Sequence, residues 1–132
     1  MALPDFAGLT GLANLLNDYK QTVITRADYL RLLRQYTHQH YLSPGHPDLQ
    51  EDYNPDTGTP IVGLERSHHY NHSTYVDLVL SGLIGVRPQA DNVLAINPLL
   101  PAVNQPDAGR PIRYFAVQGL VYHGHEVSVV YD

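Results

Sequence analysis

Two adjacent carboxylates, Glu51 and Asp52, lie within the segment LQEDYNPDTG at residues 49–58. A tyrosine, an asparagine and Pro55 follow them, and a proline fixes its own φ and biases the preceding residue away from helix. A carboxylate held at fixed geometry by such a stiff segment can act as a general base. Neighbouring loop residues usually point in different directions, so at most one of the two faces a ligand. The alternative is a solvated loop acid, which composition alone favours.

The run SHHYNHS at residues 67–73 is the second candidate site. His68 and His72 are four residues apart, a spacing that binds a metal when both lie on one helix face. No glutamate stands between them as the zinc-peptidase motif requires, and Ser73 indicates that a helix begins only afterwards. We therefore expect hydrogen-bonding histidines, no metal and no cofactor.

One further carboxylate, Asp77, falls inside an apolar helical segment. If it is buried there, it must be paired. Arg87 and Arg66 are the candidate partners.

Composition excludes several classes of protein. The 132 residues fit one domain, and the net charge of −5 argues against binding to nucleic acid or to anionic membranes. With no cysteine, disulfides and thiolate chemistry are excluded. No apolar run approaches the roughly 20 residues of a membrane helix, and no signal peptide is evident, so we expect a cytoplasmic location.

The hydrophobic pattern predicts helices over residues 9–19, 26–41 and 74–85. Thr25 and Asp28 have the spacing of a capping box at the start of the second helix. The third helix is apolar nearly all round and is expected to be buried, with Gly85 as its C-cap. Between the second and third helices we expect a long ordered loop over residues 43–72.

After Pro88 the period becomes that of strands. Residues 93–96, 112–117, 120–122 and 126–131 are the candidates, the last two forming a hairpin around His123-Gly124. The sequence thus predicts an α+β protein with a helical part at residues 1–88 and an antiparallel β part at residues 89–132.

Three separated blocks resemble the C-terminal end of the six-hairpin glycosidases, closest to mannosylglycerate-hydrolase-like and family 63-like enzymes. They are EDYNPDTG, then YNHSTYVDLVLSGLIGVRPQADNVLAINPLLP, then RYFAVQGLVYHGHEVSVVYD. The resemblance implies the last helices of an (α/α)6 barrel, closed by a small antiparallel β-structure, and an inverting hydrolysis. It places Glu51 at the general base of a Glu-x-Tyr-Asn-Pro motif. It also implies substrate-binding positions near the barrel mouth at Tyr53, Asn54, Tyr70, Asn71 and His72.

An inverting glycosidase needs a separate acid about 6.5–9.5 Å from the base. In the resembling enzymes that acid lies far upstream, and twelve helices of about 11 residues would exceed this chain. We therefore expect the C-terminal part of an inverting α-glycoside hydrolase that is inactive without an acid-bearing segment. The alternative is a non-catalytic carbohydrate-binding or assembly module. The expected partners are a carbohydrate and a completing chain or second copy, bound through uncovered apolar faces of the third helix and of residues 9–16.

Overall fold

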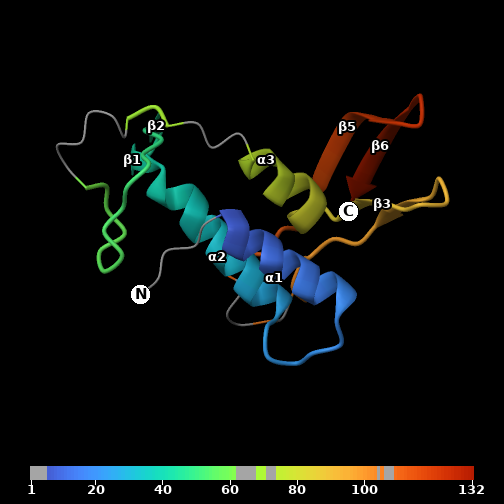
Figure 1. The fold of residues 1–132 in the computed structure, drawn as a ribbon, viewed down its shortest axis with the longest axis horizontal. Coiled ribbons are helices and arrows are strands. Elements are labelled where there is room, and N and C mark those ends of the chain that lie inside the picture. The colour runs from blue at the N-terminus through green and yellow to red at the C-terminus, as the bar shows by residue number, and fades with distance from the viewer. Residues whose placement is uncertain (1–5, 62–67, 71–73, 104, 106–108) are drawn as a thin grey trace.

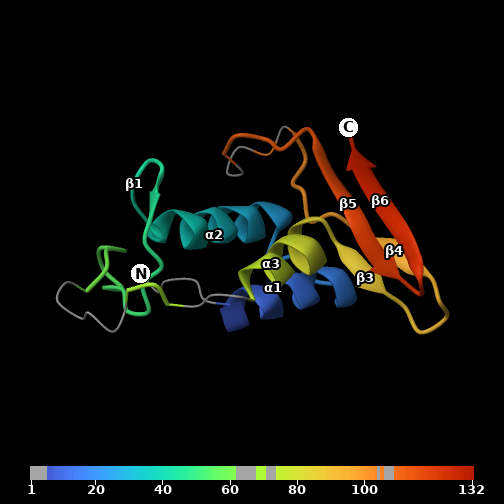
Figure 2. The same ribbon diagram turned by 90° about the horizontal axis from the view of Figure 1, so that it is seen from above.

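The computed structural model describes residues 6–61, 68–70, 74–103, 105 and 109–132. Within them the chain is helical first and antiparallel β last, so the predicted α+β order is confirmed. The elements are α1 (Phe6–Asp18), α2 (Arg26–Gln39), β1 (Tyr41–Ser43), β2 (His46–Pro47), α3 (Tyr75–Asp77), η2 (Leu78–Leu83), β3 (Val86–Pro88), β4 (Leu94–Ile96), β5 (Phe115–Tyr122) and β6 (His125–Tyr131). The helices form the middle of the molecule, with β1–β2 at one end and the other strands at the opposite end (Figures 1 and 2).

Helix α2 begins with the predicted capping box. The Thr25 hydroxyl accepts a hydrogen bond from the Asp28 N–H at 3.2 Å, and the Asp28 carboxylate accepts one from the Thr25 N–H at 2.9 Å. The Thr25 hydroxyl also donates to the Asp28 carboxylate at 2.7 Å, and this bond, together with the one from the Thr25 N–H, lowers the pKa of Asp28. The two donors at the helix start are thereby satisfied, which fixes where α2 begins.

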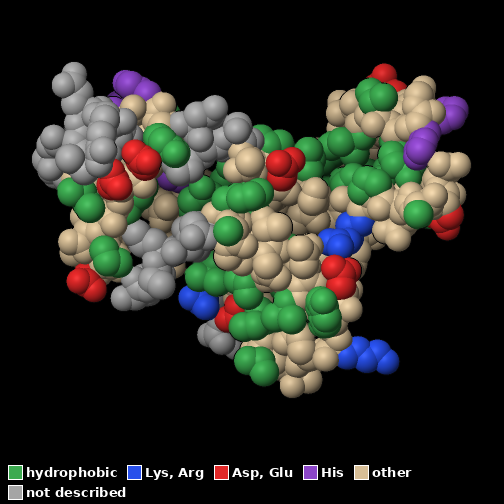
Figure 3. Space-filling view, viewed as in Figure 1, with side chains coloured by type: hydrophobic (Ala, Val, Ile, Leu, Met, Phe, Trp, Pro, Cys, Tyr) green, Lys and Arg blue, Asp and Glu red, His purple; other side chains and the backbone are tan. Residues whose placement is uncertain are grey.

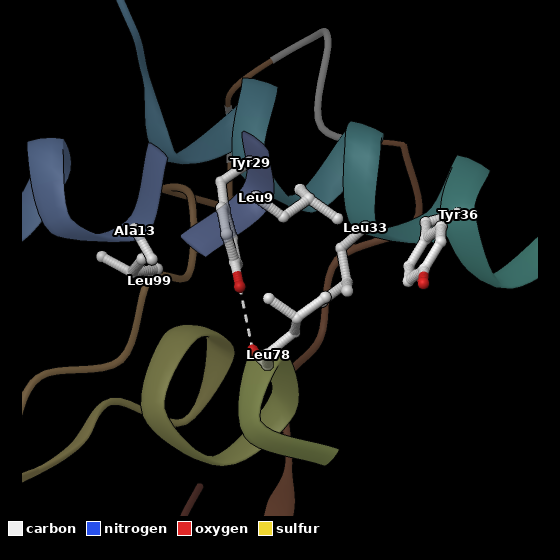
Figure 4. Packing of buried hydrophobic residues seen from close by; sticks show 7 residues of the cluster. All are labelled: Leu9, Ala13, Tyr29, Leu33, Tyr36, Leu78 and Leu99. Atoms are coloured by element: carbon white, nitrogen blue, oxygen red, sulfur yellow. Dashed lines mark hydrogen bonds between the residues drawn. The ribbon is translucent and has the colours of Figure 1, made fainter. Parts of the chain in front are cut away.

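The core lies where α1, α2 and the third helical segment meet (Figure 4). Its buried members are Leu9, Ala13, Tyr29, Leu33, Tyr36, Leu78 and Leu99. The predicted apolar face of the first helix is therefore inside the molecule rather than uncovered, since Leu9 is 1% exposed and Leu12 and Leu16 pack against the cluster. Residues 9–16 are thus not the uncovered apolar face expected from the sequence.

The third helical segment changes from α to π geometry at Leu78. The Tyr29 hydroxyl, on a side chain that is completely buried, donates to the Leu78 carbonyl at 2.9 Å. Gly82 packs on the same hydroxyl, because an added Cβ there would stand 2.0 Å from the Tyr29 oxygen. Among the described residues of this segment Leu78 and Gly82 are buried, whereas Val76 remains 56% exposed. The prediction of burial all round was wrong, since α1 and α2 meet one side only.

Asp77 is also on the exposed side and needs no buried partner. Its predicted partner Arg87 instead pairs with Asp18 at the end of α1, at 3.1 Å. The other candidate, Arg66, lies outside the described residues.

Gly85 ends the helical segment with φ +75°, as a C-capping glycine does. After this glycine, Val86–Pro88 form β3, which pairs with β4 in an antiparallel ladder that the sequence did not predict. The Asn97 N–H donates to the Gly85 carbonyl at 2.9 Å, which brings the chain after β4 back onto the helix end.

The two segments predicted as separate strands at residues 112–117 and 120–122 are one strand, β5, paired with β6. Val117 pairs with Val129 and Leu120 with Val127, so β5 has one extra residue, and Gly119 has φ +73° at this bulge. The bulge keeps Val117 and Leu120 on the same, partly buried face. The Tyr122 hydroxyl donates to carbonyls of the β3–β4 turn and so joins the two hairpins.

Among the described residues no helix is long and apolar enough to cross a bilayer. The barrel expected from the resemblance and the division at residue 88 remain proposals.

A first prediction concerns Gly85. We expect Gly85→Ala to lower the free energy of unfolding by about 2 kcal/mol or more, because a Cβ would meet the Asn97 carbonyl at 1.9 Å and φ is positive. Urea unfolding measures this. Gly11→Ala is the control: with nothing within 4 Å of its Cβ in α1, it should raise stability by up to about 1 kcal/mol. Equal effects of the two substitutions would contradict the packing described for Gly85.

Candidate functional site

The loop that carries Glu51 starts at the C-terminal end of α2. His40 is the C-cap of this helix, and its carbonyl accepts a hydrogen bond from the Asp48 N–H at 2.9 Å. Between these two residues the chain forms the small β1–β2 hairpin. The loop is thus closed onto the helix end before it reaches the acidic pair.

Glu51 and Asp52 are the two residues between a pair of anchors. The Gln50 N–H donates to the Tyr53 hydroxyl at 3.2 Å, so the residues on either side of the acidic pair are tied to one another. The same hydroxyl lies 2.7 Å from His40 Nδ1. Glu51 is exposed, whereas Asp52 is partly buried. The turn therefore exposes the Glu51 carboxylate to solvent, while its own backbone is closed by the bond between Gln50 and Tyr53.

A second set of contacts holds the Gln50 side chain, which is 2% exposed. Its amide contacts His68 Nδ1 at 2.7 Å and the Asp48 carboxylate at 2.5 Å. His68 and Asp48 form an ion pair at 3.0 Å when the histidine is protonated. His68 is thus a hydrogen-bonding histidine, as predicted, and it connects residues 68–70 to the base of the acidic turn.

Asn54 organises the turn that follows. Its side-chain oxygen accepts hydrogen bonds from the Asp56 and Thr57 N–H groups at 2.9 and 3.2 Å, and its carbonyl accepts one from the Gly58 N–H at 2.8 Å. This is the stiff Asn-Pro turn inferred from the sequence.

The other predicted substrate-binding residues lie beyond this turn. Tyr70 is 42% exposed, and its N–H donates to the Leu49 carbonyl at 2.8 Å, so it stands close to the acidic pair. Asn71 and His72, together with the predicted cap Ser73, lie outside the described residues. Tyr53 and Tyr70 are therefore near Glu51, but only the Tyr70 side chain is turned outward.

Three residues of this network were not predicted as parts of the site: His40, Asp48 and Gln50. His40 caps the C-terminal end of α2 and is 4% exposed. Its tie to Tyr53 could have been inferred only from the fold. The burial of Gln50 next to the exposed Glu51 could not be predicted, because it follows no hydrophobic period in the sequence.

Within the part of the chain that the structure describes, no group of three potential ligands could hold a metal ion. A hollow of about 590 Å³ lies beside the C-terminal end of α2. Its lining comes from the last turn of this helix and from the β1–β2 hairpin and includes Thr37, His38 and Tyr41.

A family model described as the mannosylglycerate hydrolase MGH1-like glycoside hydrolase domain matches residues 6–73, which is more than half of the chain and includes Glu51 and its anchors. The chain belongs to this family. The resemblance to mannosylglycerate-hydrolase-like enzymes is therefore confirmed. No curated protein matches the chain.

A solved structure named "Sialidase" is similar to this chain, with 37% sequence identity and a TM-score of 0.80. The match covers 96% of this chain and 11% of that chain. The domain described here thus spans only a small part of the length of that protein.

The tyrosines of the fold and of the site lead to a prediction about pH. Burial raises the pKa of Tyr29 to about 12, and burial also raises the pKa of Tyr53. Because the folded state favours the neutral phenols, the unfolded chain releases their protons first. The stability that they contribute is therefore complete below the unfolded pKa of about 10 and is lost as pH rises above it.

We expect the free energy of unfolding, measured in urea at several pH values, to fall between about pH 10 and pH 12. The Tyr29→Phe variant is the control, and its stability should fall less steeply over that interval. Parallel curves for the two proteins would contradict the burial of an un-ionised Tyr29.

Proposed function

We propose that this chain is the C-terminal part of an inverting α-glycoside hydrolase and that Glu51 is its general base. One observation carries the proposal: Glu51 is exposed at the tip of a turn whose flanking residues, Gln50 and Tyr53, are tied together and to α2. The turn falls inside the segment that matches a glycoside hydrolase family. A general base must be held at a fixed distance from the sugar, and a turn tied to a helix can hold the Glu51 carboxylate in this way.

The reaction requires two carboxyl groups with different roles. Glu51 removes a proton from a water molecule, which attacks the anomeric carbon on the face opposite the leaving group. A second carboxylic acid donates a proton to the leaving oxygen, and the two carboxyl groups must be about 6.5–9.5 Å apart to accommodate the water. We infer that this acid belongs to a further polypeptide segment, so that the chain by itself does not complete the reaction.

The substrate-binding assignments differ in their structural support. The outward Tyr70 side chain beside the acidic turn suits contact with a sugar, because a tyrosine offers both a ring and a hydroxyl. Asn71 and His72 remain assigned from the resemblance. Tyr53 and Asn54 support the turn through their own hydrogen bonds, which favours an indirect contribution to binding.

We also propose that the helices are the last ones of an (α/α)6 barrel and that a completing segment or a second copy covers the exposed apolar side chains. These residues lie mainly on and around the strands: Val93, Ile96, Tyr114, Val121, Val130 and Tyr131. Val76 adds an exposed apolar side chain on α3. Figure 3 shows apolar side chains over the helices and the hairpin on one face of the molecule.

The catalytic assignment is tested by hydrolysis of α-glucosides, α-mannosides and mannosylglycerate. We expect no turnover by the 132 residues alone. Joined to an acid-bearing segment that restores activity, the Glu51→Gln variant should lose about two to four decades of rate, the usual contribution of a general base. Asp52→Asn is the matched control and should lose far less.

Equal losses from the two substitutions, or full activity of Glu51→Gln, would contradict the assignment. Turnover by the chain alone would require an acid within it, with Glu65 and Asp77 the first to test. Sugar binding without restored hydrolysis by any segment would favour a carbohydrate-binding module.

The exposed strands lead to a separate prediction. We expect the chain to sediment as more than a monomer at high micromolar concentration, because exposed apolar side chains such as Val121 (80% exposed) and Val130 (64% exposed) would leave water at an interface. Val121→Lys and Val130→Lys place charges on the exposed face of the β5–β6 hairpin and should return it to a monomer. Val23→Lys, at a side chain 84% exposed in the α1–α2 connection, is the control and should change nothing. A strictly monomeric parent chain would contradict this proposal.

A further inference from the structure

We propose that His40 and Tyr53 are positioning residues that fix Glu51 relative to helix α2. The inference rests on the proposed function for the role of Glu51, but the anchoring itself is a property of the loop. It assigns Tyr53 a place behind the carboxylate rather than against the sugar.

The first step of the argument is the closure of the turn. A backbone N–H can only donate, so the Tyr53 oxygen accepts the bond from Gln50 at 3.2 Å. This bond ties together the residues before and after the acidic pair, and only Glu51 and Asp52 lie between them. The backbone of the turn is therefore fixed by the phenol oxygen of its own last residue.

The second step is the attachment of this closed turn to a helix. The Tyr53 oxygen is also 2.7 Å from His40 Nδ1, and the two rings meet edge to face with centroids 5.4 Å apart. His40 is the C-cap of α2 and is 4% exposed. A buried residue at the end of a helix can move little, so the phenol is held at one place.

The third step connects the helix end to the core. Tyr36 lies one helical turn before His40, and their ring centroids are 5.0 Å apart in an edge-to-face arrangement. Tyr36 belongs to the core cluster and is 4% exposed. The contacts thus form an aromatic row, Tyr36–His40–Tyr53, that runs from the core to the turn carrying Glu51.

The aromatic row explains why a buried histidine and a half-buried tyrosine stand beside an exposed acid. A carboxylate displaced by about 1 Å can lose about a hundredfold in rate. Removing the phenol oxygen would release both the closure of the turn and its attachment while leaving the Glu51 side chain itself unchanged.

The test uses Tyr53→Phe in the 132-residue chain, with amide hydrogen exchange as the readout. We expect the Gln50 amide to exchange about five to ten times faster in this variant, because its acceptor is gone. The Gly58 amide, which is held by the Asn54 carbonyl in the same loop, should keep its rate. A uniform acceleration of both amides, or an unchanged Gln50 rate, would overturn the proposal.

Tyr75→Phe is the matched control. Its hydroxyl lies 2.6 Å from the Thr37 hydroxyl of α2 and its ring contacts Tyr36, so it meets the helix that carries His40 without the contact that Tyr53 makes to Gln50. It should leave the Gln50 amide unchanged. If Tyr53→Phe does not fold, two variants of His40 replace it. His40→Asn keeps a polar group near the phenol, so the Gln50 amide should stay protected from exchange. His40→Leu removes that group, so the Gln50 amide should lose its protection.

The same variants separate this inference from the proposed function. In the chain completed with an acid-bearing segment, Tyr53→Phe should lower kcat about ten- to a hundredfold with little change in KM, because it misplaces the base without touching the sugar. A raised KM at unchanged kcat would instead make Tyr53 a substrate contact and overturn the inference. Loss of Gln50 protection together with full activity of Glu51→Gln would leave the anchoring intact and refute the proposed base.

Discussion

The arrangement of the helices depends on one buried hydrogen bond, from the Tyr29 hydroxyl of α2 to the Leu78 carbonyl of η2. A buried hydroxyl without a partner would cost about 1–3 kcal/mol, so the bond determines how close the third segment lies to the second. Gly82 is the residue that allows this approach. The bond is made at Leu78, the residue where the segment changes from α to π geometry. The chain then leaves η2 through Gly85 toward the strands.

Much of the architecture could be predicted from local signals. The capping box at Thr25, the apolar period of the first two helices and the alternation in β6 each reflect contacts within a few residues. The Asn54 turn was also evident, since Pro55 restricts the backbone and Gly58 tolerates the positive φ of 72° that the turn requires. Local signals could not predict the pairing of β3 with β4. A proline by itself argues against a strand, and Pro88 is compatible with β3 because it stands at the end of a strand that pairs with one partner.

The site was predictable in part for the same reason. Glu51 stands out through the stiff residues behind it, and the family match covers its segment. Its supports come from separate parts of the chain: His40 from a helix end, and His68 from beyond the turn. Such contacts over 13 and 18 residues leave no periodic trace in a sequence. The sequence likewise left open whether Asp77 is buried, because its exposure depends on which side of the third segment the other helices cover.

The turn that carries Glu51 contacts the core through few side chains, which affects the order in which parts of the protein unfold. The helices share a cluster of buried side chains, whereas the contacts described for the turn reach that cluster by way of the end of α2. Proteins open in cooperative units, and a unit with few buried contacts opens at a lower free energy than the whole. We therefore expect the turn to open at a lower free energy than α1, α2 and η2. Glu51 would then be present in a docked and an undocked population at equilibrium, and any molecule that contacts only the docked form would shift the balance between them.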